Sequence, residues 1–115
     1  GCGRVFVVDV DPRKLALAEA MGFIPLRGGD ADPVETIRAA TGGAGVQRCV
    51  EAVGLPATFL QATQVAGRFG EVVFMGNIAG TFSIGEKDFS NLLRRELTIY
   101  GTWNSKVAPS GTDDW

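Results

Sequence analysis

Short apolar runs alternate with helical patterns along most of this chain. The apolar runs predict strands at Arg4–Asp9, Phe23–Leu26, Val46–Val53, Glu71–Met75 and Leu97–Thr102. Between them, apolar residues at helical spacing predict helices at Pro12–Met21, Pro33–Thr41, Pro56–Ala66 and Phe89–Arg95. This alternation is typical of βαβ units around a parallel sheet, so we expect an α/β fold.

Local signals mark several of the element boundaries. Asp11-Pro12 and Asp32-Pro33 each place a capping carboxylate before a proline at the first helical position. Gly22 and Gly67 are predicted to end the helices that precede them. Pro25 lacks the N–H that a central strand would need, which predicts an edge strand.

The first predicted strand ends on a carboxylate, Asp9, near residue 1. In a dinucleotide-binding α/β fold, such a carboxylate binds the adenosine ribose, about 20 residues after a Gly-rich phosphate loop. No residue of this sequence lies that far before Asp9. We therefore expect a partial Rossmann fold, doubly wound and mostly parallel, that lacks its first strand and Gly-rich loop.

Asp9 is the first candidate for a cofactor contact. A carboxylate here would accept ribose hydroxyls and repel the 2′-phosphate of NADP, which favours NAD. The alternative is a loop residue that caps the next helix, but Asp11 is better placed for that task. Lys14 and Arg13 are basic where the helix dipole disfavours cations, so one of them could lie along the adenosine; a solvated surface charge is the alternative.

Residues that follow the later strands are further candidates, because parallel sheets collect ligand contacts at the carboxyl ends of their strands. Glycine there lets a flat ring approach the backbone, and an aromatic side chain with an amide could form a wall of the site. Ordinary turns and a packed corner are the alternatives. These candidates are Val53 and Gly54, then Met75, Gly76 and Asn77, and finally Trp103 and Asn104.

Two other features carry less functional weight. Glu51 lies in an apolar strand, where a buried carboxylate needs a partner that the sequence does not name. Gly42–Gly45 has the composition of a phosphate loop. A strand rather than a helix is predicted after it, however, so no helix N-terminus would face a phosphate.

Composition narrows the function further. A chain of 115 residues fits one domain, and 11 basic against 13 acidic residues make nucleic acid and anionic membranes poor partners. Two cysteines without histidine exclude a disulfide framework and a Cys/His zinc site, so we expect free thiols and a cytoplasmic location. No apolar run approaches the ~20 residues of a membrane span. No catalytic constellation is present, because no histidine can act as a base beside a nucleophile.

Several blocks of sequence follow one another in a recognisable order. They are Val5–Asp11 with Pro12-Arg13-Lys14-Leu15, Thr41-Gly42-Gly43, Val50–Gly54, and Asn91–Ser105, closed by Asp113-Asp114-Trp115. The chain thereby resembles the coenzyme domain of zinc-dependent medium-chain dehydrogenases, especially the polyol branch with sorbitol and galactitol-phosphate dehydrogenases. The resemblance covers nearly all of residues 1–115.

The resemblance implies a role for each candidate. Asp9 matches the ribose-binding acid and Lys14 the basic residue beside the adenosine, whereas Val53 and Gly54 match the edge of the adenine pocket. Met75, Gly76 and Asn77 match the nicotinamide side, and Trp103 with Asn104 the closing wall. The glycine fingerprint and the catalytic domain with its zinc ligands are not in this sequence, so no metal is assigned to the chain.

We therefore expect residues 1–115 to be an incomplete NAD-binding Rossmann domain, without the catalytic zinc domain. The parent enzyme would transfer a hydride between NAD and a polyol or other secondary alcohol. The isolated chain would be inactive and would bind NAD weakly or not at all. Strand edges left open by a missing first strand would favour self-association. The alternative is a non-catalytic Rossmann-like fragment that folds by strand exchange.

Overall fold

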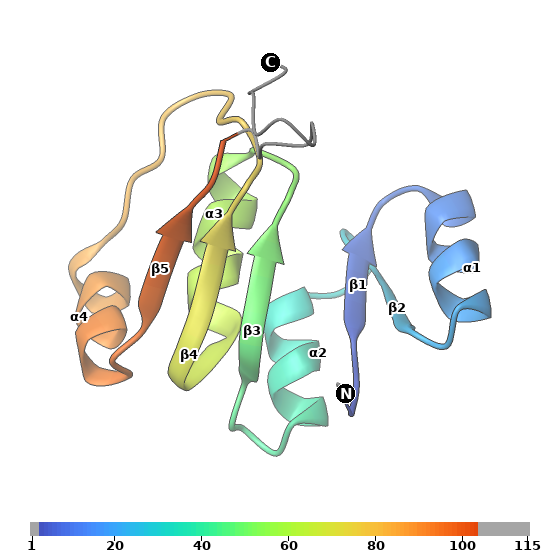
Figure 1. Cartoon of the computed structure of the whole chain (residues 1–115), viewed down its shortest axis with the longest axis horizontal. Coiled ribbons are helices and arrows are strands. Elements are labelled where there is room, and N and C mark those ends of the chain that lie inside the picture. Colours follow the sequence, from blue (N-terminus) through green and yellow to red (C-terminus); the bar gives the residue numbers. More distant parts are fainter. Residues whose placement is uncertain (1–2, 104–115) are drawn as a thin grey trace, which may run out of the picture. The chain divides into compact units, whose positions relative to one another are not determined.

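The computed structural model describes residues 3–103, which fall into two compact units. The first unit lies within residues 1–44 and the second within residues 45–115 (Figure 1). Parallel strands alternate with helices in both units, which confirms the predicted α/β class. None of the helices within residues 3–103 has the length and apolar character of a membrane span.

The first unit is built around a two-stranded parallel sheet. Phe6 is paired with Ile24 at one end of the sheet and Asp9 with Arg27 at the other. Ala18 and Ile37 are the buried residues of its two helices. In chain order, the elements are β1 (Phe6–Asp9), α1 (Pro12–Ala20), β2 (Ile24–Arg27) and α2 (Pro33–Ala40).

Both helices of the first unit begin where the sequence predicts. The Asp11 carboxylate accepts the Arg13 N–H at 2.9 Å, and the Asp32 carboxylate accepts the Val34 N–H at 2.9 Å. Each bond satisfies an N–H that has no partner within the helix, and a proline fills the first helical position. The capping prediction is therefore confirmed.

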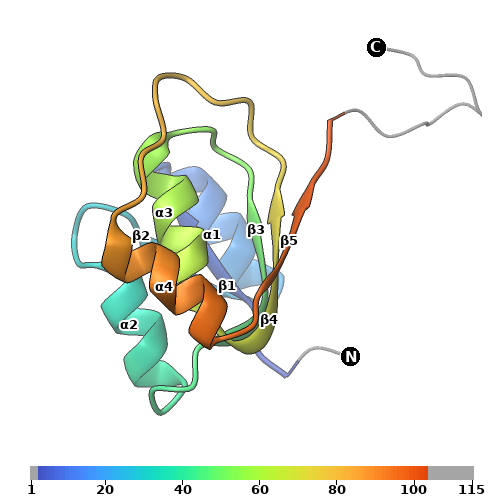
Figure 2. The ribbon, with the colours of Figure 1, turned by 90° about the vertical axis from the view of Figure 1, so that its left-hand side faces the viewer.

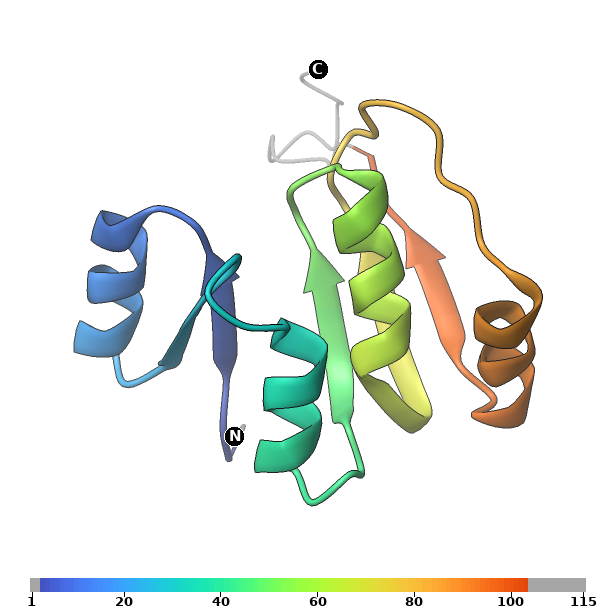
Figure 3. The ribbon, with the colours of Figure 1, turned by 180° about the vertical axis from the view of Figure 1, so that it is seen from behind.

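The second unit is a three-stranded parallel sheet in the order β3-β4-β5. Figures 2 and 3 show α3 and α4 on the same face of this sheet. Val72 is fully buried on that face, with Ala62 and Ala66 beside it. The elements are β3 (Val46–Glu51), α3 (Pro56–Val65), β4 (Ala66–Phe74), α4 (Glu86–Arg94) and β5 (Thr98–Gly101).

Polar side chains from all three strands meet on the sheet of the second unit. Arg48 Nε donates to Glu71 Oε1 at 2.9 Å, and the Tyr100 hydroxyl donates to Glu71 Oε2 at 3.1 Å. The bond from Arg48 lowers the pKa of Glu71, whereas the bond to Glu71 raises the pKa of Tyr100. These contacts join residues far apart in sequence through the parallel register.

The start of β4 and the start of α4 were predicted too late. β4 begins at Ala66 instead of Glu71, so Gly67, the predicted end of a helix, lies inside the strand. Its first part pairs with β3 through a register shift, and Phe69 adopts a φ of 60°, a conformation that strand patterns do not encode. α4 begins at Glu86, three residues before the first apolar residue of the predicted helix. Its first turn carries Glu86 and Asp88, and acidic side chains stabilise a helix N-terminus.

Candidate functional site

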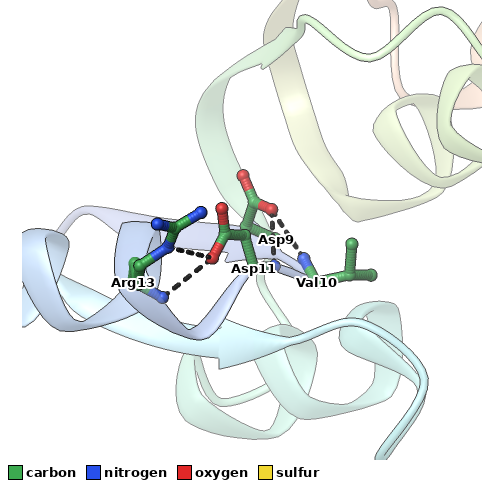
Figure 4. A network of polar contacts seen from close by, with 4 residues as sticks. All are labelled: Asp9, Val10, Asp11 and Arg13. Atoms are coloured by element: carbon green, nitrogen blue, oxygen red, sulfur yellow. Dashed lines mark hydrogen bonds and ion pairs between the residues drawn. The ribbon is translucent and has the colours of Figure 1, made fainter.

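Asp9 lies at the carboxyl end of β1, where its side chain shapes the turn into α1. Its Oδ1 accepts the N–H of Val10 at 2.7 Å and the N–H of Asp11 at 2.9 Å (Figure 4). Asp9 therefore has a structural task of its own in this turn, beside any role toward a ligand. The prediction that Asp11 caps α1 is confirmed. The turn uses both carboxylates, because Asp9 accepts the N–H groups of Val10 and Asp11 while Asp11 accepts that of Arg13.

These bonds leave part of the Asp9 carboxylate for a ligand. Within residues 3–103 no hydrogen bond reaches Oδ2, and in Figure 4 this oxygen points away from the turn. The Asp11 N–H, more than any other group, holds the pKa of Asp9 below its ordinary value; partial desolvation opposes it, and the Val10 N–H and the Lys14 charge add to the lowering. Asp9 is thus an anion at neutral pH whose Oδ2 accepts no hydrogen bond from residues 3–103.

The two basic candidates differ in their surroundings. The positive charge of Lys14 helps to lower the pKa of Asp9, so the two side chains are near enough to interact. Arg13 points its Nε toward Asp11 Oδ1 at 3.8 Å, and its side chain is 94% exposed. The structure therefore gives Arg13 a partner on the helix cap and makes Lys14 the better candidate for a ligand contact.

Glu51 ends β3 and is only 4% exposed. Its carboxylate accepts the Gly54 N–H at 2.9 Å and the hydroxyl of Thr58. Its backbone carbonyl accepts the N–H groups of Met75 and Gly76 at 2.9 and 3.1 Å. The buried carboxylate of Glu51 thus has Gly54, in the loop after β3, and Thr58, on α3, as its hydrogen-bond donors. The sequence analysis did not identify Thr58.

The loops after β3 and β4 approach each other closely. Gly54 has a φ of +92°, and a Cβ there would lie 2.2 Å from the Asn77 carbonyl oxygen. A Cβ on Gly76 would lie 2.4 Å from the Gly54 nitrogen. The Gly54 carbonyl in turn accepts the Ala79 N–H at 2.8 Å. Glycine at both positions is therefore required by backbone packing.

A pocket of about 300 Å³ lies beside these loops. The predicted residues Gly76, Asn77 and Trp103 line it, so the structure brings these three together. Val53 and Met75 are exposed but do not line it, and Asn104 lies outside the described residues. Sequence reasoning missed its other lining residues, which are mainly aromatic: Phe59, Phe74, Ile78 and Phe82.

The predicted contacts are divided between the two units. Asp9, Arg13 and Lys14 belong to the first, and the remaining candidates belong to the second. The loop Gly42–Gly45 leads into β3 and not into a helix, as predicted, so no helix N-terminus follows it. Within residues 3–103 no group of three or more His, Cys, Asp or Glu side chains could hold a metal ion.

Cys49 is predicted to be an unreactive thiol. Burial, with a smaller contribution from the Glu51 charge, raises its pKa to about 11. At pH 8 the thiolate fraction is then about a hundredfold below that of an ordinary cysteine. In a Cys2→Ser variant we expect iodoacetamide to label native protein at least tenfold more slowly than urea-unfolded protein. Equal rates, measured by mass spectrometry, would contradict this prediction.

Comparison with known proteins places this arrangement in a family. The family model for zinc-binding dehydrogenases matches residues 1–115. Galactitol 1-phosphate 5-dehydrogenase of Escherichia coli (strain K12) is 23% identical over 116 residues, covering 100% of this chain and 34% of the relative. L-threonine 3-dehydrogenase of Bacillus velezensis is 34% identical over 71 residues, covering 61% of this chain and 20% of that protein. The chain thus spans about a third or less of these relatives.

Solved structures agree in fold. An alcohol dehydrogenase zinc-binding domain protein from Burkholderia ambifaria superposes with a TM-score of 0.79 at 30% identity, covering 89% of this chain and 27% of that one. 2R,3R-butanediol dehydrogenase from Bacillus subtilis gives 0.78 at 27% identity, with coverages of 89% and 28%. The fold matches the Rossmann-like NAD-binding domain of alcohol dehydrogenases. The chain belongs to the zinc-binding dehydrogenase family of medium-chain alcohol and polyol dehydrogenases.

Proposed function

We propose that this chain is the NAD-binding portion of an oxidoreductase that transfers a hydride between NAD and a secondary alcohol, with polyols as the first substrates to test. The observation that carries the proposal is Asp9, an anion at the end of β1 whose Oδ2 is oriented away from the turn. Relatives named as dehydrogenases of galactitol 1-phosphate and of 2R,3R-butanediol support the substrate class.

The residues of the chain fit different parts of the cofactor. Asp9 Oδ2 would accept a hydroxyl of the adenosine ribose, and its charge would disfavour a 2′-phosphate. Lys14 would border the adenosine. Gly76 and Asn77 line the aromatic pocket together with Trp103, where a flat ring could bind, whereas Gly54 is buried and supports the loop behind them. When bound, NAD supplies the hydride acceptor.

Catalysis is not proposed for this stretch of the chain. Residues 3–103 do not fit a zinc ion, since they hold no suitable group of ligands, and no step is assigned to one. The zinc-dependent chemistry and the choice among alcohols would belong to other parts of the whole enzyme. Self-association through open strand edges stays a prediction.

Titration of the 115-residue chain with NAD tests the proposal. We expect weak binding, in about the millimolar range, because the sequence has no Gly-rich turn that opens a helix beneath the pyrophosphate. NAD should shift the amide resonances of Val10 and Asp11, and NADP should bind at least several-fold more weakly. Asp9→Asn keeps an acceptor for the turn but loses the charge, and should weaken NAD binding about tenfold.

A matched control uses another acidic residue of the same unit. Asp30 is exposed, and its carboxylate lies 4.0 Å from Arg27 Nε in a weak surface ion pair, so Asp30→Asn should leave NAD affinity unchanged. The proposal fails if NAD causes no shift in the unsubstituted chain. It also fails if Asp9→Asn binds NAD as well as Asp30→Asn does.

A further inference from the structure

Glu51 joins the two loops that carry the proposed contacts of the second unit. Its carbonyl holds the N–H groups of Met75 and Gly76 after β4, and its carboxylate holds the Gly54 N–H after β3. The residue is 4% exposed, so water cannot readily replace these partners. One residue at the end of β3 is thus bonded to both loops.

Thr58 completes the contacts of this carboxylate. Its hydroxyl has two acceptors within reach of its single proton, Glu51 Oε2 and the Leu55 carbonyl at 2.8 Å, and it accepts the Leu55 N–H at 3.2 Å, just before α3 begins. The negative charge therefore lies near the N-terminal end of a helix, where the helix dipole stabilises it. A Cβ on Gly76 would lie only 2.6 Å from Glu51 Oε1, so the carboxylate also packs directly against the second loop.

We propose that Glu51 is a positioning residue, whose buried carboxylate and carbonyl hold the loops after β3 and β4 in the arrangement through which Gly76 and Asn77 contact NAD. It acts through the loops and does not touch the cofactor, because its side chain is enclosed by protein. The identity of the ligand rests on the proposed function. The coupling of the loops to Glu51 does not, and it can be measured without NAD.

Amide hydrogen exchange in the NAD-free chain tests the coupling. Glu51→Gln leaves one acceptor oxygen for two donors, and Thr58→Val removes one donor, whereas Thr58→Ser keeps the hydroxyl. The Ala79 N–H, which bonds to Gly54 O at 2.8 Å, reports on the loops. We expect its exchange to be about tenfold faster in Glu51→Gln and Thr58→Val and near the original rate in Thr58→Ser.

Three results would overturn the coupling. Exchange at Ala79 could stay unchanged in both disruptive variants, or it could rise equally in Thr58→Ser. It could also rise uniformly with exchange at the core residue Val72, which would mean a general loss of stability. If Glu51→Gln does not fold, the exchange rates of Ala79 in Thr58→Val and Thr58→Ser still test the coupling.

NAD titration then separates positioning of the site from support of the fold. We expect NAD-induced shifts at Gly76 and Asn77 to need about tenfold more NAD in Thr58→Val than in Thr58→Ser. Equal affinities in the two variants, with exchange altered at Ala79, would overturn the positioning role. Absence of NAD-induced shifts in the unsubstituted chain would instead overturn the proposed function. The coupling of Glu51 to the loops would then be tested by amide exchange at Ala79 alone.

Discussion

Replacing Gly54 with alanine is expected to destabilise the second unit by about 3 kcal/mol or more. The new methyl group would stand 2.2 Å from the carbonyl oxygen of Asn77, and the φ of +92° is strained for any residue with a Cβ. Rotating a side chain relieves neither the clash nor the strain, because the carbonyl oxygen and the φ angle both belong to the backbone. Urea denaturation followed by circular dichroism measures the loss.

Gly80 offers a matched control for Gly54. It also has a positive φ, +107°, but a Cβ there would meet the Pro56 ring at ordinary contact distances, 3.6 Å from Cγ and 4.0 Å from Cδ. Gly80→Ala should therefore show the conformational cost alone, about 1 to 2 kcal/mol. If the two variants lose the same stability, the close approach of Gly54 to Asn77 is not what requires glycine at residue 54.

Replacing Phe59 with alanine is expected to cost about 3 to 5 kcal/mol, the usual range for a buried phenylalanine. Phe59 is 5% exposed, and its ring meets Phe74 edge-on with centroids 5.0 Å apart. Phe82 lies near both rings, with its centroid 5.9 Å from that of Phe59 and 6.5 Å from that of Phe74. Removal of the ring would take away part of the pocket wall and leave Phe74 and Phe82 without this packing partner.

Phe89 is the matched control for Phe59, because it is also a helical phenylalanine but is 51% exposed, on α4. Phe89→Ala should cost less than about 1 kcal/mol. Denaturation curves of both variants, with equal m-values, would give the difference. A loss at Phe59 no larger than that at Phe89 would show that the aromatic cluster does not support the second unit.

Much of the fold could be predicted because its signals are local. The Asp-Pro pairs at Asp11 and Asp32 mark helix starts through a bond that spans only two residues. Valine-rich runs mark β1 and β3. The start of β4 escaped prediction, since Phe69 is held at a positive φ while its N–H donates to the Arg95 carbonyl, 26 positions away in sequence, at 2.7 Å.

The candidate site was predicted less completely, for a related reason. Gly76, Asn77 and Trp103, which line the pocket of the second unit, were proposed because they follow strands of a parallel sheet. Thr58 and the phenylalanines of the pocket carry no such signal. Their roles depend on which side chains α3 and the loop before α4 bring to the end of β4.

By itself, the sequence determined the order and type of the elements, the family, and the carboxylate at the end of β1, because each depends on neighbouring residues or on a run of matching blocks. Only the tertiary structure decided what the carboxylates do. Asp9 holds its turn with one oxygen, and Glu51 finds its donors in Gly54 and Thr58. Hydrogen-bond partners and close backbone approaches depend on where the chain returns in space, and spacing along the sequence does not contain that information.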